Sequence, residues 1–161
     1  MAPALTSKSD AIQLVLESTC AVSRGWNPER REPRPPRFPY HAIWDTGATI
    51  SAISKRVAEE CRPTRVTETP VQGVHGMAYL PVHLITLELP NGIIIPGLEV
   101  IAADLGDAEV LIGMDVITRG DLAVTNADGF TQFSFRTPSQ GHIDFTAESD
   151  PGGRPAAPPT P

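Results

Sequence analysis

The chain has 161 residues, of which 40% are hydrophobic, and this is enough for one domain with a packed core. A formal net charge of −6 argues against general affinity for nucleic acid, and the sequence has no apolar run long enough to cross a membrane. Two cysteines, Cys20 and Cys61, make a poor disulfide framework, so we expect a reduced, cytoplasmic protein without a signal peptide.

Residues 1–37 are predicted to precede the main domain as an extension. Ile12, Leu14 and Leu16 alternate with other residues, a pattern consistent with an edge strand. Five arginines then lie among prolines between residues 24 and 39, with two glutamates that dilute the charge. This composition favours a solvated linker over a basic docking arm or a processing site. The sequence leaves open whether the extension is an inhibitory propeptide, an extra strand or a tether.

An Asp-Thr-Gly-Ala sequence, residues 45–48, occurs once and directly follows the apolar residues 42–44. Beyond it, Ser54 is placed to cap a short helix that would carry Val57 and Cys61 on one face. On that face Cys61 is a packing residue, which argues against a nucleophilic Cys–His pair.

A glycine-bearing hairpin is predicted next, with a turn formed by Gly73, Val74, His75 and Gly76. In the following strand the apolar positions change phase between Leu84 and Leu87, which indicates a bend or a bulge. Asn91-Gly92 is a two-residue hairpin signal, and residues 93–95 and 98–102 would return as strands.

A second distinctive element is Val110-Leu111-Ile112-Gly113, which ends 68 residues after Asp45. Residues 114–119 are predicted to form a short helix that ends at Gly120. Strands are then expected at 122–125 and 130–135, on either side of the turn Ala127-Asp128-Gly129.

Three aromatic residues of the last strand can have either of two roles. They can bury surface against a second subunit or close the core of one chain, and both stay open: Phe130, Phe133 and Phe135. The proline-rich tail, residues 148–161, is predicted to be disordered.

The order of these motifs resembles the retropepsin-like aspartic proteases, in which one chain supplies half of the active site. The resemblance covers Asp45-Thr46-Gly47-Ala48, the hairpin at 71–77 and the element Leu111-Ile112-Gly113. It implies an all-β acid-protease barrel over residues 38–147, with a flap hairpin, one or two short helices and one lobe per chain. Thr49 and Met114 stand where viral members usually carry a carboxylate and an arginine, and so the chain is more similar to the cellular and bacterial members.

The resemblance also implies residue roles. Asp45 would be catalytic, Thr46 would form a hydrogen bond across a dimer axis, and Gly47 and Ala48 would line the substrate site. The hairpin turn would be a flap that closes over the substrate through Gly73, Val74, His75 and Gly76. Leu111, Ile112 and Gly113 would cross behind the active-site loop.

The implied function is an aspartic endopeptidase that acts on polypeptides as a homodimer. Two copies of Asp45 close together would share one proton and activate a water molecule that attacks the peptide carbonyl. The alternative is a module of the same fold that binds peptides or dimerises without proteolysis. No cofactor or metal is expected, because His41, His75, His83 and His142 lack a metal-ligand spacing.

Overall fold

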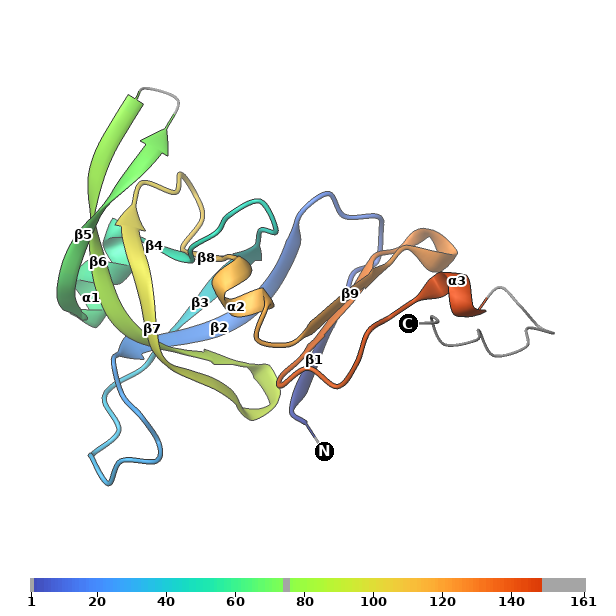
Figure 1. Ribbon diagram of the computed structural model, residues 1–161, viewed down its shortest axis with the longest axis horizontal. Coiled ribbons are helices and arrows are strands. Elements are labelled where there is room, and N and C mark those ends of the chain that lie inside the picture. Colours follow the sequence, from blue (N-terminus) through green and yellow to red (C-terminus); the bar gives the residue numbers. More distant parts are fainter. Residues whose placement is uncertain (1, 74–75, 149–161) are drawn as a thin grey trace, which may run out of the picture.

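The computed structural model describes residues 2–73 and 76–148. Within these ranges the chain forms ten strands and a few short helices (Figure 1). In chain order these are β1 (Ala4–Lys8), β2 (Leu16–Arg24), β3 (Phe38–Trp44), β4 (Ala52–Ser54), α1 (Lys55–Cys61), β5 (Thr64–Gly73), β6 (Gly76–Leu89), η1 (Pro90–Gly92), β7 (Ile93–Ala103), β8 (Val110–Ile112), α2 (Met114–Ile117), β9 (Asp121–Thr125), η2 (Ala127–Gly129), β10 (Gln132–Arg136) and α3 (Phe145–Glu148).

Six strands close into a barrel, in the order β2-β3-β8-β4-β7-β6, because β2 pairs with both β3 and β6. The pairs β3–β8 and β4–β7 are parallel, and the other pairs of the ring are antiparallel. Strand β5 adds to the outside of β6 and forms a long hairpin that projects from the barrel (Figure 1). The predicted all-β barrel class is confirmed. The edge strand expected near residues 11–22 forms only in part. Ile12 and Leu14 lie before β2, which begins at Leu16. This strand pairs with β3 from Leu16 to Val22 and with β6 only from Ala21 to Arg24, where it completes the ring.

A second, three-stranded sheet, β1-β10-β9, packs against the barrel through aromatic side chains. The ring of Trp44 lies 5.6 Å from that of Phe133 and 5.0 Å from that of Phe135, and all three are buried. Phe133 and Phe135 therefore belong to the core of one chain rather than to a subunit interface. Phe130 is half-buried, and the Lys8 ammonium lies 4.2 Å from its ring centre.

Several local predictions are confirmed. Ser54 caps α1 by accepting a hydrogen bond from the Val57 amide. The phase change in β6 is a register shift between Ile85 and Leu87, where the β6–β7 pairing is irregular. The Asn91-Gly92 hairpin forms with a three-residue loop, and Asn91 has a φ of 60°. The return is one continuous strand, β7, rather than two.

The predicted domain boundaries are not tested by the structure and stay predictions. Upstream of residue 38, however, β1 and β2 each belong to one of the two sheets, so this region contributes strands to the fold. Val74 and His75 and the tail from residue 149 lie outside the described residues. Among the described helices, none is both long and apolar enough to cross a membrane.

Candidate active site

Asp45 lies at the end of β3 and begins an irregular segment, residues 45–51, that we call the Asp45 loop. Its amide donates to the carbonyl of Ile112 at 2.9 Å, which continues the parallel pairing of β3 with β8. The loop then turns back on its first residue, since the Gly47 amide donates to Asp45 Oδ1 at 2.8 Å. The Asp45 carboxyl group is half-buried and is fixed in direction by its own backbone.

Gly47 is favoured at its position by close approach rather than by an unusual backbone angle. A Cβ atom added there would lie 3.1 Å from Asp45 Oδ1. A larger side chain would therefore press against the carboxylate and disturb its hydrogen bond with the amide. This gives a physical reason for glycine two residues after the aspartate.

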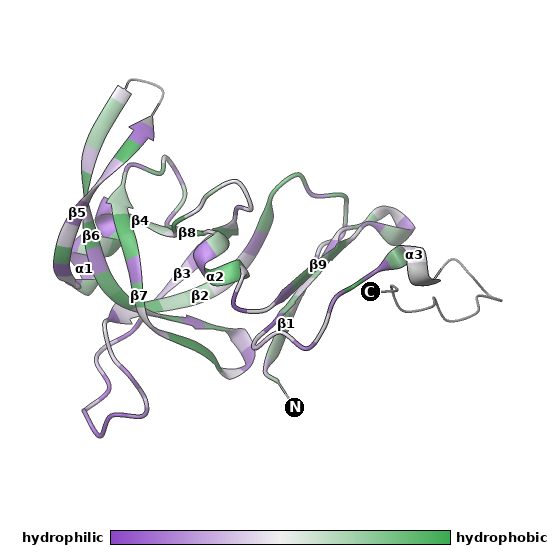
Figure 2. Ribbon diagram, in the orientation of Figure 1, coloured by the Kyte–Doolittle hydropathy of each residue, from purple (hydrophilic) through white to green (hydrophobic). Residues whose placement is uncertain are grey.

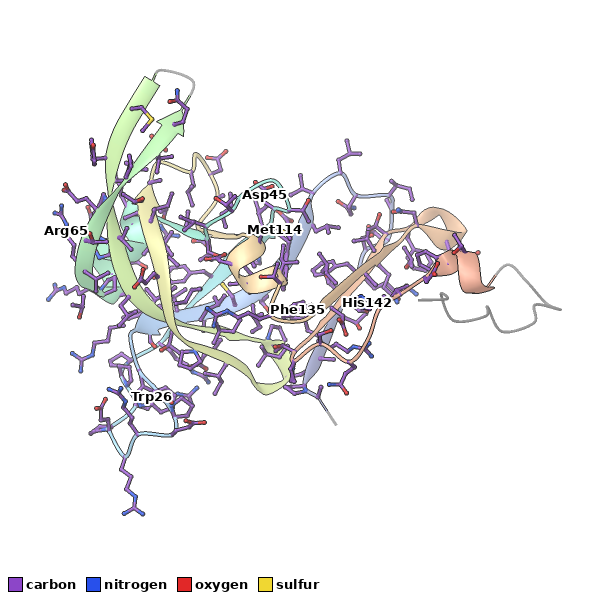
Figure 3. All side chains as sticks on the ribbon, in the orientation of Figure 1. Trp26, Asp45, Arg65, Met114, Phe135 and His142 are labelled. Atoms are coloured by element: carbon purple, nitrogen blue, oxygen red, sulfur yellow. The ribbon has the colours of Figure 1, made fainter. Side chains whose placement is uncertain are left out.

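The far end of the Asp45 loop is held by the residues after β8. The Met114 amide donates to the carbonyl of Ala48 at 2.8 Å. A Cβ atom added to Gly113 would lie 2.9 Å from the oxygen of Ala48 and from the backbone carbon of Ile50. Leu111 and Ile112 of β8 pair with β3, and Gly113 lies against the loop; Figure 3 shows Asp45 and Met114 at the same end of the barrel.

Asp115 completes the support, and the sequence analysis gave it no role. Its carboxylate accepts from the Ser51 hydroxyl at 2.6 Å and from the Ser51 amide at 3.0 Å. The Ser51 hydroxyl in turn accepts from the Gly113 amide at 3.0 Å. Ser51 is buried, so these bonds are shielded from water. A serine six residues after Asp45 and an aspartate two residues after Gly113 were visible in the sequence, but nothing there joined them.

The other residues of the motif face outward. Thr46 and Thr49 are exposed, and the Thr46 hydroxyl has no hydrogen bond within the part of the chain that the structure describes. Ala48 is half-buried beneath α2. Because Asp115 already accepts from Ser51, it does not act as a second carboxyl group for Asp45. One chain therefore presents a single aspartate on a firmly held loop.

The β5–β6 hairpin forms as predicted, with Gly73 paired to Gly76 at the end of the described ladder. Gly76 has a φ of +108°, a conformation that favours glycine. Tyr79 on this hairpin is 70% exposed. Val74 and His75 lie outside the described residues.

A cavity of about 680 Å³ lies against the outer face of β3. Ile43 lines it and precedes Asp45 by two residues, although Asp45 itself is not among the lining residues. Its charged rim includes Glu17, Asp104 and Asp107. A volume of this size accommodates several side chains of an extended peptide.

The cysteines do not form a reactive site. Both are free and buried, and burial, with a smaller contribution from the charge of Cys61, raises the pKa of Cys20 to about 12. Burial also raises the pKa of Cys61, whose thiol packs against Tyr40. Neither thiol forms the thiolate that a nucleophile needs. Among the described residues no cluster of three or more histidine, cysteine or acidic side chains has the arrangement of a metal site.

Comparison with known proteins gives a family match and similarities to solved structures. Residues 37–119 match the model of a family described as "gag-polyprotein putative aspartyl protease". Among solved structures, the chain is similar to a retropepsin-like aspartic protease from Rickettsia conorii, with 10% identity, a TM-score of 0.42 and coverage of 78% of this chain and 97% of the other. It is also similar to the retroviral protease-like domain of Ddi1 from Leishmania major, with 21% identity, a TM-score of 0.45 and coverage of 74% and 93%. No curated protein sequence matches the chain.

Proposed function

The chain belongs to the retropepsin-like family of aspartyl proteases, and on that premise we propose that it is an aspartic endopeptidase that works as a homodimer. The observation that carries the proposal is the Asp45 loop, which holds one carboxyl group in a fixed direction through Ile112, Gly47 and Asp115. An aspartic protease needs two such groups. A second copy of the chain supplies the other one.

The chemistry follows from the pairing of two like charges. Two Asp45 carboxyl groups that face each other share one proton, because both cannot ionise easily at close range. The ionised group takes a proton from a water molecule whose oxygen bonds to the peptide carbonyl carbon. The protonated group donates to the carbonyl oxygen. Transfer of a proton to the amide nitrogen then breaks the C–N bond and releases the amine.

Exposed apolar side chains support the dimer. Leu14, in the segment between β1 and β2, is 98% exposed, and Ile12, Val15 and Ile50 are also exposed. The segment and the Asp45 loop both lie on the upper side of the molecule in Figure 1. A second subunit that covered them would remove this apolar surface from water and bring the two loops together. The free hydroxyl of Thr46 would then have a partner across the axis.

The substrate in this proposal is an extended polypeptide that lies between the Asp45 loop and the β5–β6 hairpin. The hairpin acts as a flap, with Gly73 and Gly76 next to its turn, and its closure excludes water from the reaction. Substrate side chains enter the cavity lined by Ile43. The catalytic role of Asp45 and the flap role of the hairpin rest on this arrangement and on the family.

The direct test is digestion of a diverse peptide mixture by the purified protein between about pH 4 and 7, with mass spectrometry as the readout. Asp45→Asn keeps the size of the side chain and should lower cleavage at least about 100-fold. Cuts that persist in this variant would contradict the proposal. A folded, dimeric wild-type chain that cuts nothing would favour the alternative, a peptide-binding or dimerisation module.

The dimer is tested separately by analytical ultracentrifugation of Leu14→Glu. Burial of one leucine contributes about 2 kcal/mol and a symmetric dimer buries two, so the dissociation constant should rise at least about 100-fold. Cleavage at low protein concentration should fall with the dimer. Val66→Glu is the matched control, because Val66 is an exposed apolar residue on the outer strand β5. A strictly monomeric wild-type enzyme that still cleaves would refute the dimer.

A further inference from the structure

The loop between β2 and β3, residues 25–37, has no part in the proposed reaction. We call it the Pro/Arg segment. It projects from the end of the barrel opposite to the Asp45 loop, as the positions of Trp26 and Asp45 in Figure 3 show, and its surface is largely hydrophilic (Figure 2). Residues 31–37 belong to no helix or strand. Despite this, the segment is anchored to the barrel.

The sequence restricts the backbone of this segment strongly. Pro33, Pro35 and Pro36 have φ fixed near −65°. Glu32, Arg34 and Pro35 each precede a proline, which excludes the helical region and favours an extended one. The conformation that satisfies both restrictions is the polyproline II helix. It has three residues per turn, so residues three apart share an edge.

The contacts of the segment repeat with this period of three. Arg34 and Arg37 both donate to the same oxygen, Oε2 of Glu88 on β6, and the Arg37 bond is 2.8 Å long. Glu88 is buried, with its side chain 9% exposed. The Arg34 guanidinium also lies 5.4 Å from the ring centre of Trp26, whose indole N–H donates to the carbonyl of Glu32. One edge of the segment is thus fixed to the barrel.

The prolines of the segment also divide into buried and exposed positions. Pro35 is buried, whereas Pro33 and Pro36 are exposed and share an edge. Arg30, three residues before Pro33, is also exposed, and its guanidinium has no ion pair or hydrogen bond within the described part of the chain. Arg30 ends a turn that its amide closes with the Asn27 carbonyl, and the outward-facing prolines follow it. The exposed sequence Arg-x-x-Pro-x-x-Pro from Arg30 to Pro36 is what we call the proline edge.

We propose that the proline edge is the binding site for a protein domain with a polyproline groove of the SH3 type. Aromatic side chains of such a groove contact the two prolines, and a carboxylate beside the groove pairs with Arg30. The anchors on Glu88 and Trp26 hold the segment in its bound conformation before the partner arrives. This lowers the entropy lost on binding.

The test uses the full chain with Asp45→Asn, so that the partner is not digested. It is titrated by calorimetry with purified SH3 domains that select Arg-x-x-Pro-x-x-Pro ligands. Saturable binding is expected, weakened at least tenfold by Pro33→Ala or Pro36→Ala and about fivefold by Arg30→Ala. The control Arg31→Ala removes the same charge from the neighbouring residue and should change affinity less than twofold. Absence of binding, or equal losses from Arg30→Ala and Arg31→Ala, would overturn the proposal.

A further variant tests the role of the anchor. Glu88→Gln removes the charge that holds Arg34 and Arg37 while leaving the proline edge intact. If the anchor preorganises the edge, affinity should fall about fivefold and the entropy of binding should become less favourable. Near-UV circular dichroism confirms that the barrel remains folded. Unchanged affinity in a folded variant would contradict preorganisation.

Discussion

The Asp45 loop and the Pro/Arg segment are both irregular, and each is held by one carboxylate from elsewhere in the chain. Asp115 accepts from the amide and hydroxyl of Ser51, which are neutral donors. Glu88 accepts from two guanidinium groups that are about half exposed. Hydrogen bonds from neutral donors depend less on salt than ion pairs with half-exposed guanidinium groups, which salt screens. Both regions are therefore anchored, but the Asp45 loop is held by hydrogen bonds from neutral donors and the Pro/Arg segment by ion pairs that salt weakens.

The largest expected effect is that of Asp115→Ala. It removes the charged acceptor of the Ser51 amide, the Ser51 hydroxyl and the Val116 amide, and it leaves the buried donors of Ser51 without this partner, so stability should fall by about 3 kcal/mol. The Asp45 loop would also lose its position. A shift of about 1 Å lowers cleavage about 100-fold. Chemical denaturation and the peptide assay measure the two effects.

Glu99→Ala is the control, because Glu99 on β7 is an exposed carboxylate whose side chain forms no bond within the described residues. Its effect on stability should stay within about 0.5 kcal/mol. If Asp115→Ala cleaved peptides at the wild-type rate, the loop would not depend on this anchor. The proposed difference between the anchor of the Asp45 loop and the anchor of the Pro/Arg segment would then be wrong.

A smaller effect is expected when the other anchor is removed. Glu88→Ala should destabilise the protein by about 1–2 kcal/mol, since its partners are partly solvated, and should leave peptide cleavage unchanged. In 1 M NaCl the loss should shrink, because the screening length falls to about 3 Å. The loss of stability caused by Asp115→Ala should stay the same in 1 M NaCl. Glu68→Ala, which breaks the exposed pair with Arg65, serves as the control.

The two anchoring carboxylates, Asp115 and Glu88, could not be predicted from the sequence. Asp45, Gly47 and Gly113 were found because their roles depend on a local motif and on contacts that only glycine permits. The Ser51–Asp115 pair spans 64 positions, and Glu88 lies 54 positions after Arg34. Neither pair has a spacing that a single sequence reveals.

The same limit explains the errors in the fold. Strand β2 was predicted as an edge because its alternation gives one buried face but not its second partner, β6. Phe133 and Phe135 left two roles open because aromatic residues suit a core and an interface equally. Only the position of Trp44 between the two sheets decided between them.

The smallest expected effect separates the two anchors by pH. Burial raises the pKa of Glu88, but the hydrogen bonds from Arg34 and Arg37 outweigh it and hold the pKa below the ordinary value of a glutamate. Glu88 thus stays ionised at lower pH in the folded protein than in the unfolded chain. Its contribution to stability is complete above the unfolded pKa, near 4.3, and is lost as the pH falls through the lower folded value. The Pro/Arg segment should therefore remain docked between about pH 4.5 and 7, the range in which the proposed protease works.

The indole N–H resonance of Trp26 reports whether the segment is docked, because that group donates to the Glu32 carbonyl within the segment. The chemical shift of this resonance should stay constant between about pH 4.5 and 7 and change only in stronger acid. In Glu88→Gln this change in acid should disappear. A transition near pH 6 in the wild-type chain would show that some other group controls docking and that Glu88 is not the anchor.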